Sequence, residues 1–153
     1  MSDNLPASLW KLRDSAAQLN QLTDQANNTV KEVENFLNRE CSVGVQASVR
    51  VQESPLVDQE GEPVGTSVQF LEYRRVGGTY RIAVVWGTDL DPGDERVKAW
   101  SDCPRDEKLE TIEKLPELIE AIAAALDEKV ETARRATQSV STLLKALRGK
   151  EGA

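Results

Sequence analysis

The sequence contains no histidine, and this absence excludes more chemistry than any other feature of the composition. Ser–His and Cys–His nucleophile pairs need an imidazole as general base, and most zinc sites use histidine as a ligand. An enzyme built from this chain would have to rely on carboxylate or lysine chemistry. We therefore expect a non-enzymatic protein with no catalytic residue, no metal and no cofactor.

Cysteines and long apolar runs are also scarce. The chain has 2 cysteines, Cys41 and Cys103, without the CxxC spacing of redox or zinc motifs. No apolar run approaches the roughly 18 residues that cross a bilayer, and the first residues, 1–4, show no secretory signal pattern. We expect a cytoplasmic protein without membrane contact. Two free thiols are expected there, and a bridge is the alternative because both cysteines flank the predicted sheet.

A surplus of basic residues is missing as well. The 153 residues include 19 Lys and Arg against 26 Asp and Glu, which gives a net charge of −7. General nucleic-acid binding needs a basic surface, so no nucleic acid is expected, whereas a basic protein partner is compatible with this charge. With 39% hydrophobic and 29% charged residues, the chain has the composition of one globular domain spanning residues 1–153.

Two amphipathic stretches bracket the chain and predict long helices over residues 5–40 and 104–148. In both, apolar and small residues recur at steps of three and four, which places them along one stripe of a helix. Pro6 suits a first helical turn, Pro116 predicts a kink, and Gly149 predicts the helix end. Each long helix would span roughly 50 Å. We interpret Thr23 as a weak point in the first stripe, and a register-setting polar layer is the alternative.

Between the helices, residues 43–101 predict an antiparallel meander. Residues 43–52 alternate apolar and polar side chains, which is typical of a half-buried strand. Residues 53–65 contain prolines, glycines and acids and predict a loop or a wide hairpin turn. Gly77-Gly78 predicts a two-residue hairpin that places Tyr73 opposite Ile82 and Arg74 opposite Arg81. The further strands are expected at residues 66–75, 79–86 and, less clearly marked, 96–100.

The fold class that follows is α+β, with three or four antiparallel strands between two long helices. We expect the helices to pair antiparallel, in a coiled-coil-like manner, because Ile122, Leu126 and Val130 are spaced by two consecutive steps of four and break a strict heptad. Helices of this length exceed what a small sheet can cover, so a homo-oligomer, most simply a dimer, is expected. The candidate interface residues are Leu9, Leu12, Leu19, Val30, Leu126, Val130, Val140 and Leu144.

Basic side chains on the predicted strands are the candidate ligand site. Arg74 directly opposite Arg81 is unfavourable unless a negative group joins them. Glu72 is the expected local partner, and a bound carboxylate or phosphate, with Arg50 as a further ligand, is the alternative. The acids Asp89, Asp91, Asp94 and Glu95 form a predicted turn whose spacing does not fit a calcium loop, because Gly93 occupies the fifth position of that pattern.

Three hypotheses of function follow. The first is a non-enzymatic binding or assembly protein that acts as a homo-oligomer through its long helices. The second is a small acidic chaperone, immunity protein or antitoxin that masks a basic partner. The third is a protein that sequesters an anionic small molecule or nucleotide with Arg50, Arg74 and Arg81.

Overall fold

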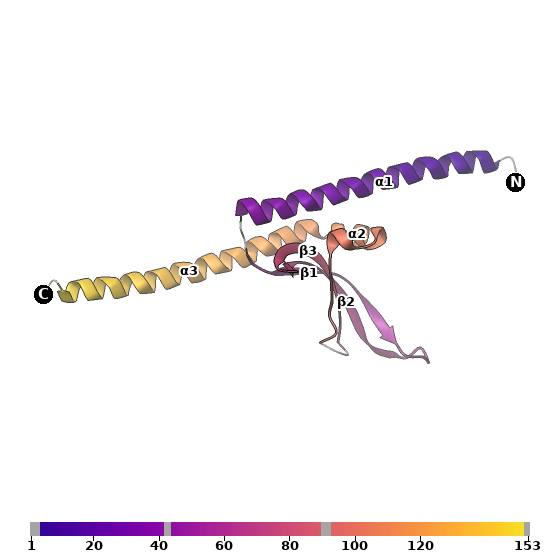
Figure 1. Cartoon of the computed structure of the whole chain (residues 1–153). Coiled ribbons are helices and arrows are strands. Elements are labelled where there is room, and N and C mark those ends of the chain that lie inside the picture. Colours follow the sequence, from indigo (N-terminus) through magenta and orange to yellow (C-terminus); the bar gives the residue numbers. More distant parts are fainter. Residues whose placement is uncertain (1–3, 42–43, 90–92, 152–153) are drawn as a thin grey trace.

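The computed structural model describes residues 4–41, 44–89 and 93–151. It confirms the α+β class: a long N-terminal helix, one sheet of antiparallel strands and a long C-terminal helix follow each other along the chain (Figure 1). The strands lie in the sheet in the order β1-β2-β3-β4, so each strand pairs with its neighbour in sequence.

The N-terminal helix α1 comprises Leu5–Asn35 and has Pro6 in its first turn, as expected. It continues into a π-helical segment, η2 (Phe36–Cys41). Asn38 in this segment donates a hydrogen bond to the Tyr80 carbonyl at 2.9 Å and accepts one from the Tyr73 hydroxyl. The wider turn therefore coincides with the point where the helix is fixed to the sheet.

The strands are longer than the sequence predicts. The first strand, β1, comprises Ala47–Val57 and β2 comprises Pro63–Val76, so most of the expected loop at 53–65 is strand. Val43 lies outside the described residues, and the expected start at residue 43 is corrected because Gly44–Gln46 are not in a strand. Because β1 is an edge strand, it tolerates Pro55, whose missing N–H need not pair.

The central hairpin has the predicted register. Gly77 and Gly78 both have positive φ, 63° and 90°, as a primed two-residue turn requires. Tyr73 pairs with Ile82 and Arg74 pairs with Arg81 across β2 and β3 (Thr79–Thr88).

The short fourth strand, β4 (Arg96–Ala99), leads through a 3-10 turn, η3 (Trp100–Asp102), into two helices. The first, α2, is Arg105–Ile112, and the second, α3, is Leu115–Glu151. The break therefore falls just before Pro116, as predicted. Gly149 does not end α3, because the helix continues through it to Glu151.

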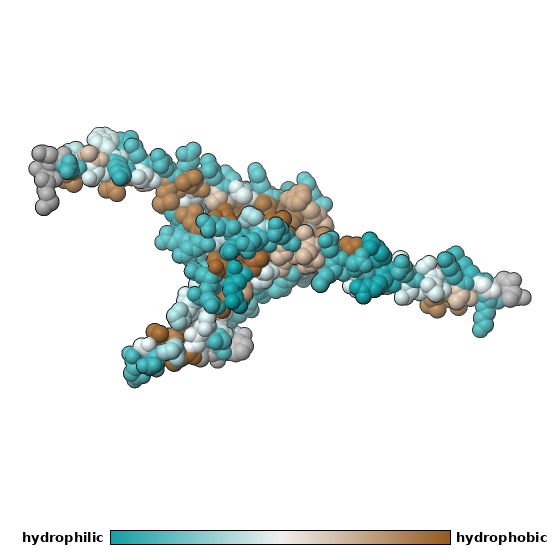
Figure 2. All heavy atoms as spheres, turned by 180° about the vertical axis from the view of Figure 1, so that it is seen from behind, coloured by the Kyte–Doolittle hydropathy of each residue, from teal (hydrophilic) through white to brown (hydrophobic). Residues whose placement is uncertain are grey.

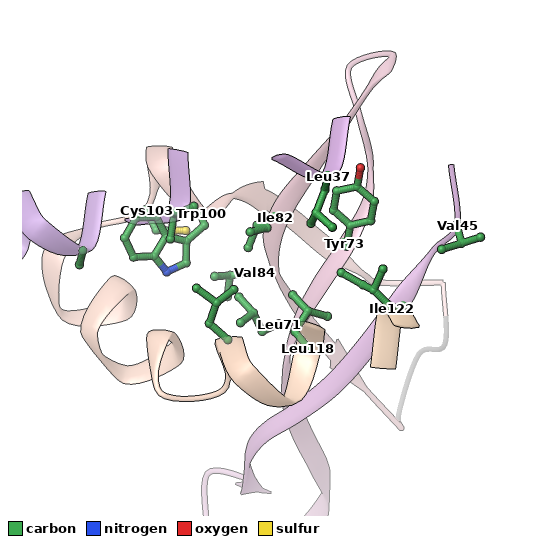
Figure 3. Close-up of a cluster of buried hydrophobic side chains, with 14 residues drawn as sticks. Leu37, Val45, Leu71, Tyr73, Ile82, Val84, Trp100, Cys103, Leu118 and Ile122 are labelled. Atoms are coloured by element: carbon green, nitrogen blue, oxygen red, sulfur yellow. The ribbon is translucent and has the colours of Figure 1, made fainter. Parts of the chain in front are cut away.

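The core lies between one face of the sheet and the helices. Leu71, Tyr73, Ile82 and Val84 project from β2 and β3 and are fully or almost fully buried. Figure 3 shows these side chains with Leu37 from η2 and with Leu118 and Ile122 from α3. Further core residues are Ala26, Val30, Val45, Ala47, Trp100, Cys103 and Leu115.

The two long helices differ from the antiparallel pair expected from the sequence. In Figure 1, α1 and α3 run in the same direction, and only the C-terminal part of α1 lies beside the beginning of α3. The remaining part of each helix leaves the body of the protein, on opposite sides (Figure 1). Each long helix therefore covers the sheet over part of its length and projects beyond it over the rest.

Candidate functional site

The outer half of α1 is an uncovered helix, which we call the N-arm and define as residues 5–22. Every residue of the N-arm is exposed. Its stripe includes Leu5, Leu9 and Leu12 with exposed fractions of 60%, 58% and 65%, and Trp10 beside the stripe is 61% exposed. Figure 2 shows apolar atoms on this projecting helix. Burial begins only at Thr23, whose hydroxyl donates to the Leu19 carbonyl at 2.7 Å. This hydroxyl is thus bonded within its own helix, and Thr23 is buried where α1 meets the body of the protein.

The outer part of α3 is a second uncovered helix, which we call the C-arm and define as residues 127–150. Every residue of the C-arm is exposed. Its apolar stripe keeps a strict alternation of steps of three and four, as in a heptad repeat. Its Val and Leu members are 45–56% exposed. The stripe consists of Val130, Ala133, Thr137, Val140, Leu144 and Leu147.

The predicted interface residues separate into two groups. Val30 is 3% exposed and Leu126 packs against the core, so both stabilise the fold and neither is free for an interface. The consecutive steps of four at Ile122, Leu126 and Val130 mark the point where α3 leaves the body. The other candidates lie on the arms with their apolar side chains exposed: Leu9, Leu12, Leu19, Val130, Val140 and Leu144.

The C-arm is intrinsically a weak helix. Its middle, residues 136–142, reads Ala-Thr-Gln-Ser-Val-Ser-Thr and is rich in residues of low helix propensity. The hydroxyls of Thr137, Ser139 and Thr142 each donate to a carbonyl four residues earlier, at 2.8, 3.1 and 2.9 Å. Such bonds give little support to a helix. An isolated helix of this length is marginal in water, and packing of its apolar face normally supplies the missing stability.

The strand arginines do not converge on one site. Arg74 is paired with Glu72 at 3.1 Å, as expected from the sequence, and with Glu95 at 3.0 Å. Arg81 donates to the Ser101 hydroxyl at 2.5 Å, and Arg50 pairs with Glu53 at 3.3 Å. Two carboxylates therefore relieve the repulsion between Arg74 and its cross-strand neighbour without a ligand.

Glu34 of α1 closes an open stretch of the sheet. Its carboxylate accepts the backbone N–H of Ile82 at 2.9 Å, beyond the end of β4 on that edge of β3. Burial raises the pKa of Glu34, and the Ile82 hydrogen bond and the charge of Arg81 oppose this rise. Burying the Glu34 carboxylate therefore costs free energy, and the hydrogen bond from the Ile82 N–H partly offsets that cost.

The cysteines are unbridged. Cys41 is exposed and Cys103 is buried. Burial, reinforced by the nearby charge of Glu107, raises the pKa of the Cys103 thiol to about 11. Cys103 is therefore protonated near neutral pH and unsuited to nucleophilic attack.

Two of the acids before β4, Asp89 and Glu95, bind groups of the protein itself. Asp89 accepts the backbone N–H of Thr66 at 2.6 Å, and Glu95 belongs to the Arg74 network. Asp91 lies outside the described residues. Within residues 4–41, 44–89 and 93–151, no cluster of acids and cysteines has the arrangement of a metal site.

In the same parts of the chain, no helix combines the length and the apolar character needed to span a bilayer. No protein-family model matches the sequence, and neither characterised proteins nor solved structures match it significantly.

Proposed function

We propose that this chain is a non-enzymatic assembly protein that works as a homo-oligomer, and that its arms are the contact surfaces. The observation that carries the proposal is the C-arm, a fully exposed helix whose contact with the sheet is confined to its first turns, where Lys129 donates to the Gly44 carbonyl at 3.5 Å. Its sequence is a poor helix former, and its leucines are about half exposed. Fully burying one Leu or Val side chain contributes roughly 1.5–3 kcal/mol. A partner along the stripe supplies the packing that the body of the protein does not.

A second copy in antiparallel orientation fits the C-arm stripe. The steps of three, four, three, four and three read the same from both ends, so an antiparallel copy matches the whole stripe with one twofold axis near residues 138–139. In a parallel copy Ala133 would face Ala133 and leave a gap in the core of the pair. The antiparallel copy instead places Val130 opposite Leu147, Ala133 opposite Leu144 and Thr137 opposite Val140.

The residues that flank the stripe favour the same orientation. In the antiparallel register Asp127 approaches Arg148 of the other copy, and Ala136 approaches Leu143, which is 60% exposed in one chain. Lys129 near Lys150 is the one unfavourable pair, and it lies at the ends. A parallel pair brings Lys129 beside Arg134 and loses the contact between Asp127 and Arg148 of the other copy.

The pairing has a consequence for the shape of the assembly. Because the arms leave the body on opposite sides (Figure 1), two copies joined by their C-arms hold their N-arms at the two far ends. The Leu5, Leu9 and Leu12 stripe of each N-arm is then available to a further copy. The proposed protein is thus a dimer that can extend, in a reducing compartment such as the cytoplasm where its thiols stay free.

Analytical ultracentrifugation of the full chain over the micromolar range tests this proposal. We expect a dimer or larger species that dissociates on dilution. The variant Leu144→Asp should shift the equilibrium towards monomer, because it places a charge in the stripe. The matched control is Thr142→Asp, on the opposite face of the same arm, and it should associate like the wild type.

A monomer at all concentrations would refute self-association. In that case the exposed stripes would point to a different partner protein, as in the hypothesis of a masking chaperone.

A further inference from the structure

The edge strand β4 departs from the pattern of the other strands. Arg96 pairs with Trp86 and Lys98 pairs with Val84 in the register of β3 and β4. Paired residues project to the same face, so both cations lie on the helix-facing side of the sheet, where Val84 is 1% exposed. Both side chains are exposed at the edge of the sheet. Two cations therefore stand in water beside the apolar, helix-facing side of β3.

A cavity of about 550 Å³ lies at these residues. Its volume is within the range of small-molecule sites, roughly 300–1,000 Å³. Apolar and aromatic groups form part of its wall, and the cations stand among them. The lining residues are Val84, Trp86, Arg96, Val97, Lys98, Pro104 and Glu107.

The charge of this cavity is positive in a protein of net charge −7. Neither Arg96 nor Lys98 lies within ion-pair distance of a carboxylate in the parts of the chain that the structure describes. Glu107 is the single acid of the lining, and its carboxylate accepts the indole N–H of Trp86 at 2.9 Å. The two cations therefore keep their hydrogen-bond donors available.

We propose that this cavity binds a small organic anion: a carboxylate or phosphate held by Arg96 and Lys98, on an apolar ring or chain that rests against Trp86 and Pro104. Arginine offers a planar fork for such groups and lysine a point charge. Charges on an edge strand also discourage strand pairing between molecules. That role would explain the two charges on β4, but it would not explain the cavity or the apolar wall beside them.

The site is independent of self-association and differs from the arginine set expected from the sequence. Arg50 and Arg74 each pair with a carboxylate and Arg81 donates to the Ser101 hydroxyl. Among the described residues, no ion pair joins Arg96 or Lys98 to a carboxylate. The candidate anion ligands are therefore Arg96 and Lys98 at the edge of the sheet, in place of the three arginines expected from the sequence.

Titration of the ¹⁵N-labelled full chain with phenyl phosphate and benzoate tests the proposal, with the Trp86 indole N–H resonance as the readout. We expect a saturable shift with at least one of the two anions, and a dissociation constant raised at least about tenfold in the double variant Arg96→Gln/Lys98→Gln. Benzyl alcohol, which keeps the ring and lacks the charge, should bind more weakly than either anion. The control Arg50→Gln removes an exposed strand cation elsewhere and should leave binding unchanged.

Three results would overturn the proposal. They are the absence of a saturable Trp86 shift with both anions, equal binding by the double variant, and binding of benzyl alcohol as tight as that of the anions. A wild-type-like spectrum of the double variant outside the cavity shows that a loss of binding does not come from unfolding.

Discussion

Leu118 and Leu144 lie on the same helix, and replacing each with alanine separates the fold from the assembly. Leu118 is fully buried at 0% exposure beneath the sheet, whereas Leu144 is 46% exposed on the C-arm. A buried Leu→Ala change typically costs about 2–5 kcal/mol, since it removes apolar contacts and leaves a cavity. We therefore expect Leu118→Ala to lower the free energy of unfolding by that amount at every protein concentration.

Leu144→Ala should behave differently. In the dissociated chain its side chain is exposed and outside the core, so the change should stay within about 0.5 kcal/mol, as for ordinary surface substitutions. At concentrations where the wild type associates, the same variant should lose stability, because binding of a second copy stabilises the folded state by mass action.

Urea unfolding followed by circular dichroism, at two protein concentrations on either side of dissociation, measures both effects. An equal cost of Leu144→Ala and Leu118→Ala in the dilute sample would contradict the exposed position of Leu144. The same loss of unfolding free energy in Leu144→Ala at both concentrations would contradict a contact between copies at this residue.

Two further predictions concern buried titratable groups. Burial raises the pKa of Glu34, so the native state keeps its proton where the unfolded state has lost it, and stability falls as the pH rises through that window. Glu34→Gln, which retains an acceptor for the Ile82 N–H, should flatten this decline in pH-dependent urea unfolding; an unchanged decline would contradict the assignment. Cys103, with its thiol pKa at about 11, should resist alkylation near neutral pH while exposed Cys41 reacts, and both should react in denaturant. Equal rates in the native protein would show that Cys103 is accessible.

Local signals in the sequence predict much of this fold. The Gly77-Gly78 pair is sufficient to fix the register of β2 and β3, because a two-residue primed turn permits one alignment. Pro116 likewise predicts the break between α2 and α3. Strand ends were harder to predict: Glu53–Val57 contains a proline and polar residues, and it is a strand because it pairs with β2 at an open edge.

Long-range geometry was not predictable from the same signals. Periodicity identifies the stripe of a helix and carries no information on which part the sheet covers or which way two helices run. Val30 and Leu144 belong to equally regular stripes, yet one is buried by the sheet and the other is bare. For the same reason, the predicted strand at residues 96–100 places Arg96 and Lys98 in the sheet, whereas the cavity beside them depends on the position of Pro104 and Glu107 after the turn.

The most direct test of the central claim is the distance between two copies of the C-arm. Spin labels at Thr142→Cys and, separately, at Gly149→Cys, in a Cys41→Ser/Cys103→Ser background, can be measured by double electron–electron resonance. In the antiparallel register residue 149 lies level with residue 128 of the other copy, so the Gly149 labels are offset by about 31 Å along the axis. The Thr142 labels are offset by about 10 Å. The account predicts a clearly longer distance for Gly149 than for Thr142. Equal distances would indicate a parallel pair, and the absence of any dipolar signal would contradict the proposed assembly.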